Sequence, residues 1–245
     1  MNFDPSIHTA DLYSQARNLL LVGRYESAIE AFDSLLKADP ENSHAFYNRG
    51  VAYFRLRNRP AALRDLTQAV KLDPHSAMVY RSRGLCYAAM GQFAEAVADY
   101  QKANTLHPSH AKTLRNLGIA YAAMGQLENA IQQFDKAVAF DPRHLKAFWN
   151  RGLVYSRQGL YVQAVRDFTH CIELQPDYAG FYVLRGQAYE DSHNLSEAVA
   201  DYTQAILLDS SDIKAYIQRS RAYEGLGQFA QAEADKKRAR ALTRS

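Results

Sequence analysis

The stretch that decides the fold is LKAFWNRGLVYSRQGLYVQAVRDFTHCIELQPDY, residues 145–178. Its proline belongs to a series spaced 34 residues apart without a slip: Pro40, Pro74, Pro108, Pro142 and Pro176. A fixed period of this length is typical of repeat proteins, in which each repeat is one supersecondary unit. Extending the period both ways predicts seven units, starting at residues 9, 43, 77, 111, 145, 179 and 213, after an N-terminal extension of residues 1–8.

The residues that recur with this period predict a helical hairpin in every unit. With unit positions numbered 1 to 34, position 8 is small (Gly152 here) and position 20 is always alanine (Ala164), so two helices can approach closely. Large residues at positions 11 and 24, such as Tyr155 and Phe168, fill the space beside that contact. Position 15 is usually glycine (Gly159), which suits a left-handed residue ending the first helix. The proline near position 32 ends the second helix. We call the two helices helix A and helix B.

This pattern resembles the tetratricopeptide repeat family over residues 9–245. The resemblance implies an all-α fold, a right-handed superhelical solenoid of seven tandem hairpins (an α-α superhelix), whose A helices line a concave groove. It also implies a protein–protein interaction adaptor or scaffold. One such hairpin cannot bury its apolar face alone, so neighbouring units are expected to stack. The last unit carries Lys236 at position 24 and is expected to act as a polar cap.

Five units carry arginine at position 7, and the same five carry aspartate at position 23. The pairs are Arg49 and Asp65, Arg83 and Asp99, Arg151 and Asp167, Arg185 and Asp201, and Arg219 and Asp235. The two units that lack the arginine also lack the aspartate. Because the residues occur together within a unit, we predict five ion pairs between helix A and helix B, and these arginines are not counted as binding residues.

The resemblance places a bound peptide against helix A at unit positions 2, 5, 6, 9, 12 and 13. The predicted peptide-binding residues are Tyr47, Asn48, Arg81, Lys112, Arg115, Asn116, Lys146, Trp149 and Asn150. Basic and aromatic side chains favour an extended acidic peptide, and an asparagine amide can both donate to and accept from a peptide backbone. Ser82 interrupts the asparagine row at position 6. Glu190, Asp191 and Glu224 predict an acidic end to the groove.

Two other function classes stay open. One is a homo-oligomeric scaffold or assembly factor that associates through its end repeats. The other is a binder of RNA or another anionic polymer, which a formal net charge of only +3 makes unlikely.

The sequence offers little for catalysis. Cys86 and Cys171 occupy small, buried positions of the repeat and are predicted to be inert thiols. There is no metal-ligand spacing, phosphate-cradling glycine loop or nucleophile elbow, so we expect no enzyme, no cofactor and no metal site. No apolar run approaches the roughly 20 residues of a membrane span and no leader pattern is present, so we expect a cytoplasmic protein with no membrane partner.

Overall fold

The computed structural model describes residues 5–108 and 110–243, and these residues fold into fourteen α-helices with no strand. The first seven are α1 Pro5–Leu21, α2 Tyr25–Ala38, α3 Ser43–Arg55, α4 Arg59–Leu72, α5 Ala77–Ala89, α6 Phe93–Leu106 and α7 Ala111–Ala123. The others are α8 Leu127–Phe140, α9 Leu145–Arg157, α10 Tyr161–Leu174, α11 Ala179–Asp191, α12 Leu195–Leu208, α13 Ile213–Gly225 and α14 Phe229–Thr243.

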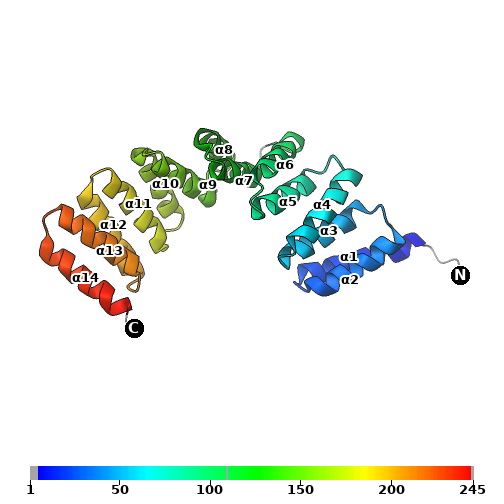
Figure 1. The fold of residues 1–245 in the computed structure, drawn as a ribbon, viewed down its shortest axis with the longest axis horizontal. Coiled ribbons are helices and arrows are strands. Elements are labelled where there is room, and N and C mark those ends of the chain that lie inside the picture. The colour runs from blue at the N-terminus through cyan, green and yellow to red at the C-terminus, as the bar shows by residue number, and fades with distance from the viewer. Residues whose placement is uncertain (1–4, 109, 244–245) are drawn as a thin grey trace. The chain divides into compact units, whose positions relative to one another are not determined.

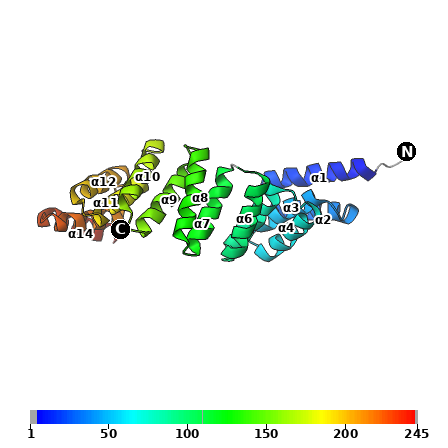
Figure 2. The same cartoon turned by 90° about the horizontal axis from the view of Figure 1, so that it is seen from above.

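Within each of the two compact units the helices pack as tandem hairpins in chain order (Figures 1 and 2), which confirms the predicted fold class. Odd-numbered helices are A helices and even-numbered helices are B helices. From α3 onward each A helix begins at the first residue of its unit, whereas α1 begins at Pro5, within the segment taken as an N-terminal extension. The chain forms two compact units, residues 1–125 and 126–245. In the first, α1, α3, α5 and α7 contact one another in turn, so the A helices form one layer.

The hairpins close because a large side chain at position 24 lies against a small residue at position 8. Phe168 is 1% exposed, and a Cβ atom added to Gly152 would lie 2.8 Å from its Cε1 atom. Gly84 stands in the same relation to Tyr100, at 2.9 Å, as does Gly186 to Tyr202, at 2.8 Å. Real Cβ atoms do not approach so closely, so a larger residue at any of these three glycines would force the ring or the helix to shift.

The turn between the helices is set by position 15, where the backbone is left-handed in all seven units. Gly159 has a φ of +74°, and the next residue, Leu160, donates its N–H to the Tyr155 carbonyl at 2.9 Å. This is the Schellman arrangement that ends a helix. Five units use glycine, as predicted, but Arg57 and His193 hold φ values of 61° and 63°.

Arg57 therefore offers a test of the turn. A residue with a Cβ atom pays about 1 kcal/mol for the left-handed conformation, which glycine avoids. We expect Arg57→Gly to raise the free energy of unfolding by about 0.5 kcal/mol, since the added freedom of the unfolded chain offsets part of the gain. The matched control is Gly159→Ala, where a Cβ atom meets nothing within 4 Å but the strained φ should cost about 1 kcal/mol. Urea unfolding followed by circular dichroism measures both; a stabilised Gly159→Ala variant would contradict this account.

The two cysteines are inert in the way the sequence predicts. Cys86 and Cys171 are free and buried, one in each compact unit, with their Sγ atoms 3.5 Å from the Arg59 carbonyl oxygen and 3.8 Å from that of Leu145. Burial raises the pKa of both thiols, that of Cys171 to about 12. Both are therefore neutral near pH 7 and lack the thiolate that nucleophilic chemistry requires.

Candidate functional site

The A helices are held in place by the five predicted arginine–aspartate pairs, all of which form. Arg151 donates from Nε to Oδ2 of Asp167 at 2.9 Å and from Nη2 to Oδ1 at 2.6 Å. The other four pairs have the same two-pronged geometry, with distances of 2.7 to 2.8 Å. Each aspartate is at most 7% exposed. These arginines therefore join helix A to helix B within a hairpin, and we do not count them as ligand-binding residues.

In four of the five units the arginine also bonds to the preceding helix B through its third nitrogen. Nη1 of Arg49 donates to Asp33, that of Arg151 to Asp135, that of Arg185 to Thr169, and that of Arg219 to Thr203. All four acceptors occupy unit position 25. The guanidinium thus joins three helices, its own A and B helices and the B helix before it. This contact was not predicted, although the recurrence of aspartate or threonine at position 25 is a signal for it in the sequence.

These third contacts differ in charge, which gives a matched test. Asp201→Asn leaves Arg185 with neutral partners alone, the new amide oxygen and the Thr169 hydroxyl, whereas Asp167→Asn leaves Arg151 beside the Asp135 carboxylate. Stranding a buried charge typically costs several kcal/mol, so Asp201→Asn should lower the free energy of unfolding by about 3 kcal/mol. We expect Asp167→Asn to lower the free energy of unfolding by about 1 kcal/mol less than Asp201→Asn does, because Asp135 remains as a counter-ion for Arg151. The difference is small because Asp135 is half-exposed. Urea unfolding measures both losses, and equal losses would show that Asp135 does not support Arg151.

The first compact unit presents an A-helix face of one charge sign. We define this A-helix face by unit positions 2, 5, 6, 9, 12 and 13 of α3, α5 and α7. None of the three helices contains an aspartate or glutamate. Once Arg49 and Arg83 are paired, four further cations remain on these positions, and among the described residues none has a carboxylate partner. They are Arg55, Arg81, Lys112 and Arg115.

Arg115 is the least usual of these cations because it is half-buried. Its Nε and Nη2 atoms donate to Oδ1 of the neighbouring Asn116 at 3.3 and 2.7 Å, a neutral acceptor. Burial lowers the pKa of Arg115, whereas the carboxylate of Asp65 raises that of Arg49. Arg115 is thus a guanidinium drawn partly out of water without a counter-ion.

Positive charge also gathers where α7 begins. The Nδ1 atom of His110 accepts the N–H of Thr113 at 3.2 Å and so caps the helix. Burial and the positive charges of Arg81, His107 and Lys112 together lower the pKa of His110. The positive N-terminal end of the helix adds to this field.

The predicted asparagines are less free than expected. Nδ2 of Asn48 donates to the Tyr13 hydroxyl at 3.0 Å and to the His44 carbonyl at 2.9 Å, so both of its hydrogens are used. Asn150 likewise donates to the carbonyl of Lys146, and Oδ1 of Asn116 accepts from Arg115. In this arrangement Asn48 has only its Oδ1 atom left for a peptide, rather than a donor and an acceptor.

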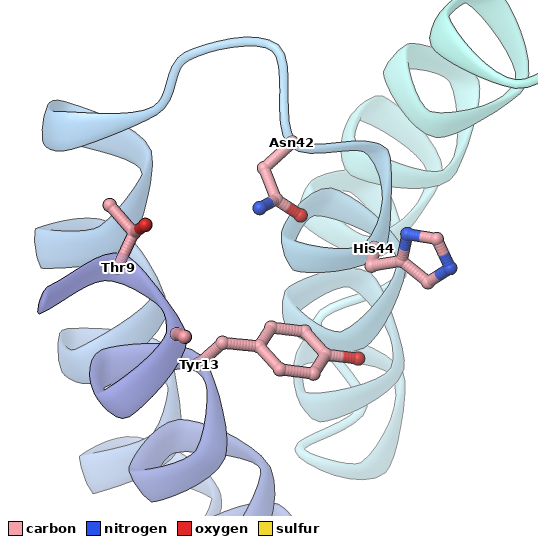
Figure 3. Close-up of a pocket in the computed structure, with 5 residues that line it drawn as sticks. Thr9, Tyr13, Asn42 and His44 are labelled. Atoms are coloured by element: carbon pink, nitrogen blue, oxygen red, sulfur yellow. The ribbon is translucent and has the colours of Figure 1, made fainter. Parts of the chain in front are cut away.

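Two hollows lie among the A helices of the first unit. The first has a volume of about 370 Å³ and is lined by Thr9, Ala10, Tyr13, Asn42 and His44. Figure 3 shows Tyr13 extending from α1 toward α3 in this hollow, which is wide and shallow. The second is about 210 Å³ and more enclosed, and it is lined by Tyr47, Val51, Phe54, Arg55, Leu66, Ser82 and Leu85. Of these seven residues, only Tyr47 was predicted as a binding residue.

In the second compact unit, α9 carries the remaining predicted residues. Lys146 is exposed, but Trp149 is half-buried and lies edge-on to Phe181, with ring centroids 6.1 Å apart. Its Nε1 atom is buried and has no hydrogen-bond partner among the described residues. Trp149 therefore packs partly against the core, and part of its side chain stays accessible.

Two of the three residues at the predicted acidic end of the groove are bonded to other side chains, and one of these two carboxylates is paired with a cation. The Tyr202 hydroxyl donates to Glu190 at 2.7 Å, and the Nζ atom of Lys236 donates to Glu224 at 2.5 Å. In both cases position 24 bonds to position 12 of the same unit. Lys236 thus bonds within the last hairpin.

Within the described part of the chain, no group of His, Cys, Asp and Glu side chains could hold a metal ion. No helix in these same ranges is long and apolar enough to cross a membrane.

Sequence profiles described as tetratricopeptide repeat match residues 13–58, 43–76, 75–143, 145–178 and 179–212. The chain therefore belongs to the tetratricopeptide repeat family, whose members are protein-interaction scaffolds and are typically not catalytic. No curated protein matches the sequence.

Solved structures of similar fold include the C-terminal part of a tetratricopeptide repeat protein from Cytophaga hutchinsonii, with a TM-score of 0.83 and 22% identity, covering 94% of this chain and 95% of that one. MamA from Desulfovibrio magneticus RS-1 has a TM-score of 0.65 and 23% identity, over 69% of this chain and 95% of its own. YrrB, described as a tetratricopeptide repeat protein with an unusual peptide-binding site, has a TM-score of 0.66 and 21% identity, over 76% of this chain and 96% of its own. These likenesses show the fold.

Proposed function

We propose that this protein is a cytoplasmic adaptor that binds an extended acidic segment of another protein along the A-helix face of its first compact unit. The observation that carries the proposal is the charge of that face. The three consecutive A helices α3, α5 and α7 contain no acidic residue. They carry four cations that have no carboxylate partner among the residues the structure describes. A face of one charge sign attracts a segment of the opposite sign and orients it.

Arg115 strengthens the case because it is half-buried and, among the described residues, bonds only to a neutral amide oxygen. Removing a guanidinium from water without a counter-ion is costly, and a ligand carboxylate would supply the missing partner in a two-pronged arrangement. Arg81 and Lys112 would add long-range attraction from the start of α7, where they already depress the pKa of His110.

The second compact unit offers a similar surface on α9. That helix also lacks acidic residues and provides Lys146, Trp149 and Asn150. We propose these three residues as a second binding surface, which belongs to the second compact unit. The YrrB structure supports peptide binding as a use of this fold, and the two free cysteines suit a reducing compartment.

The test uses a fluorescein-labelled peptide of sequence EDEAEDE and its neutral counterpart QNQAQNQ. We expect the acidic peptide to bind more tightly, with an affinity that falls as salt is raised, because exposed charges are screened. Arg81→Ala and Arg115→Ala should each weaken it about fivefold, which corresponds to about 1 kcal/mol. Fluorescence anisotropy measures the affinities, and the emission of Trp149 reports whether α9 takes part.

The matched control is Arg64→Ala, which removes an equal charge from an exposed position on α4, outside the A-helix face. It should leave the affinity nearly unchanged. Wild-type affinity in the Arg81→Ala, Arg115→Ala double variant, or an equal loss in Arg64→Ala, would refute the proposed site.

Self-association through the end hairpins is the second candidate, favoured by Phe229, which is 70% exposed on the last helix. A molar mass that rises with concentration in light scattering would support it.

A further inference from the structure

Two hairpins lack the aromatic ring at position 24: the last, which carries Lys236, and the second. Position 24 holds an aromatic ring in five units: Phe32, Tyr100, Phe134, Phe168 and Tyr202. In the second unit, position 24 is Leu66, which is 1% exposed and packs against Gly50. A Cβ atom added to Gly50 would lie 3.0 Å from the Cγ atom of Leu66. The rings reach further. The Tyr202 hydroxyl bonds to Glu190 at position 12, and Asn116, at position 6 of the next unit, lies close enough to Tyr100 to influence the pKa of its hydroxyl.

The residue that would meet such a ring is also small. Position 6 of the next unit is Ser82, where three other units carry asparagine. The two short side chains, Leu66 from α4 and Ser82 from α5, therefore leave space where a ring precedes Asn48, Asn116 or Asn150 in those units. That space is the enclosed hollow of about 210 Å³, and Phe54 at position 12 and Ser82 at position 6 both line it.

The hollow has the size and lining of a site for one apolar side chain. Its walls include Val51, Phe54, Leu66 and Leu85, and an apolar cavity of about 150 Å³ is enough to bind benzene. Leu85, which lines the hollow from α5, is 43% exposed, so the hollow is open to solvent on the A-helix face. Arg55 is the cation in its lining, and no acidic residue lines it.

We propose that this hollow is an anchor pocket, which takes a phenylalanine or leucine side chain flanked by carboxylates in the bound segment. The inference rests on the proposed function and names the partner more closely. The apolar walls exclude a charged anchor, while Arg55 in the lining and Arg81, next to Ser82 in the chain, favour acidic neighbours on either side of it. A buried apolar anchor within a charged surface is the usual form of a binding hot spot. On this proposal, the serine that interrupts the asparagine row, Ser82, is what leaves the pocket open to a ligand.

The decisive variant is Leu66→Phe, which installs the ring that other units carry at this position. Peptides EDEFEDE and EDEAEDE differ only in the anchor, and burial of a phenylalanine ring should make the first bind wild type at least tenfold more tightly. In Leu66→Phe the two affinities should become equal, near the wild-type affinity for EDEAEDE. Ser82→Asn, which fills the pocket from the opposite wall, should act in the same direction. Leu66→Ile keeps the volume and should keep the tenfold ratio.

A second probe separates this inference from the proposed function. Neutral N-acetyl-phenylalaninamide should shift the methyl resonances of Val51 and Leu85 in wild type but not in Leu66→Phe. If it does so while neither peptide binds, the pocket stands and the acidic-segment proposal fails. If both peptides bind wild type equally and the methyl resonances do not move, the pocket is refuted and the proposed function stands. A tenfold ratio that persists in Leu66→Phe would also overturn the pocket.

Discussion

The contact between the small residue at position 8 and the side chain at position 24 sets how closely each pair of helices can approach. At Gly152 the Phe168 ring occupies the space that a Cβ atom would need. The close approach brings the residues sixteen positions apart, such as Arg151 and Asp167, within 2.6 Å of each other. The ion pairs that hold each A helix in place therefore depend on this packing. So does the pocket, which exists where the side chain at position 24 is too short to fill its share of the space.

Arginine shows how one residue type can serve two purposes in the same helix layer. At position 7 the arginine pairs with an aspartate of its own helix B, and in four units it also bonds to position 25 of the preceding helix B. Its charge therefore stabilises the fold. At position 5 Arg115 finds only the amide of Asn116, and burial lowers its pKa. The presence or absence of a carboxylate sixteen residues further along separates the structural arginine from the one proposed to bind a ligand.

The hairpins, their left-handed turns and the five ion pairs could be predicted because each depends on residues within one 34-residue unit. What could not be predicted depends on neighbouring units or on side-chain length. The bond from Arg185 to Thr169 spans two hairpins. The burial of Trp149 depends on Phe181 in the next unit. Leucine and phenylalanine both fit the apolar pattern at position 24, so the sequence alone does not show that Leu66 leaves a space beside Ser82. The three-dimensional arrangement shows it.

The most direct test of the account is to locate a bound segment on the surface. A peptide with photoreactive p-benzoylphenylalanine between carboxylates, EDE-Bpa-EDE, can be cross-linked to the full chain and the attachment sites mapped by mass spectrometry. The account predicts cross-links concentrated on Val51, Phe54 and Leu85 in wild type, and their loss in Leu66→Phe. Cross-links concentrated on the B helices, or an unchanged pattern in Leu66→Phe, would contradict it.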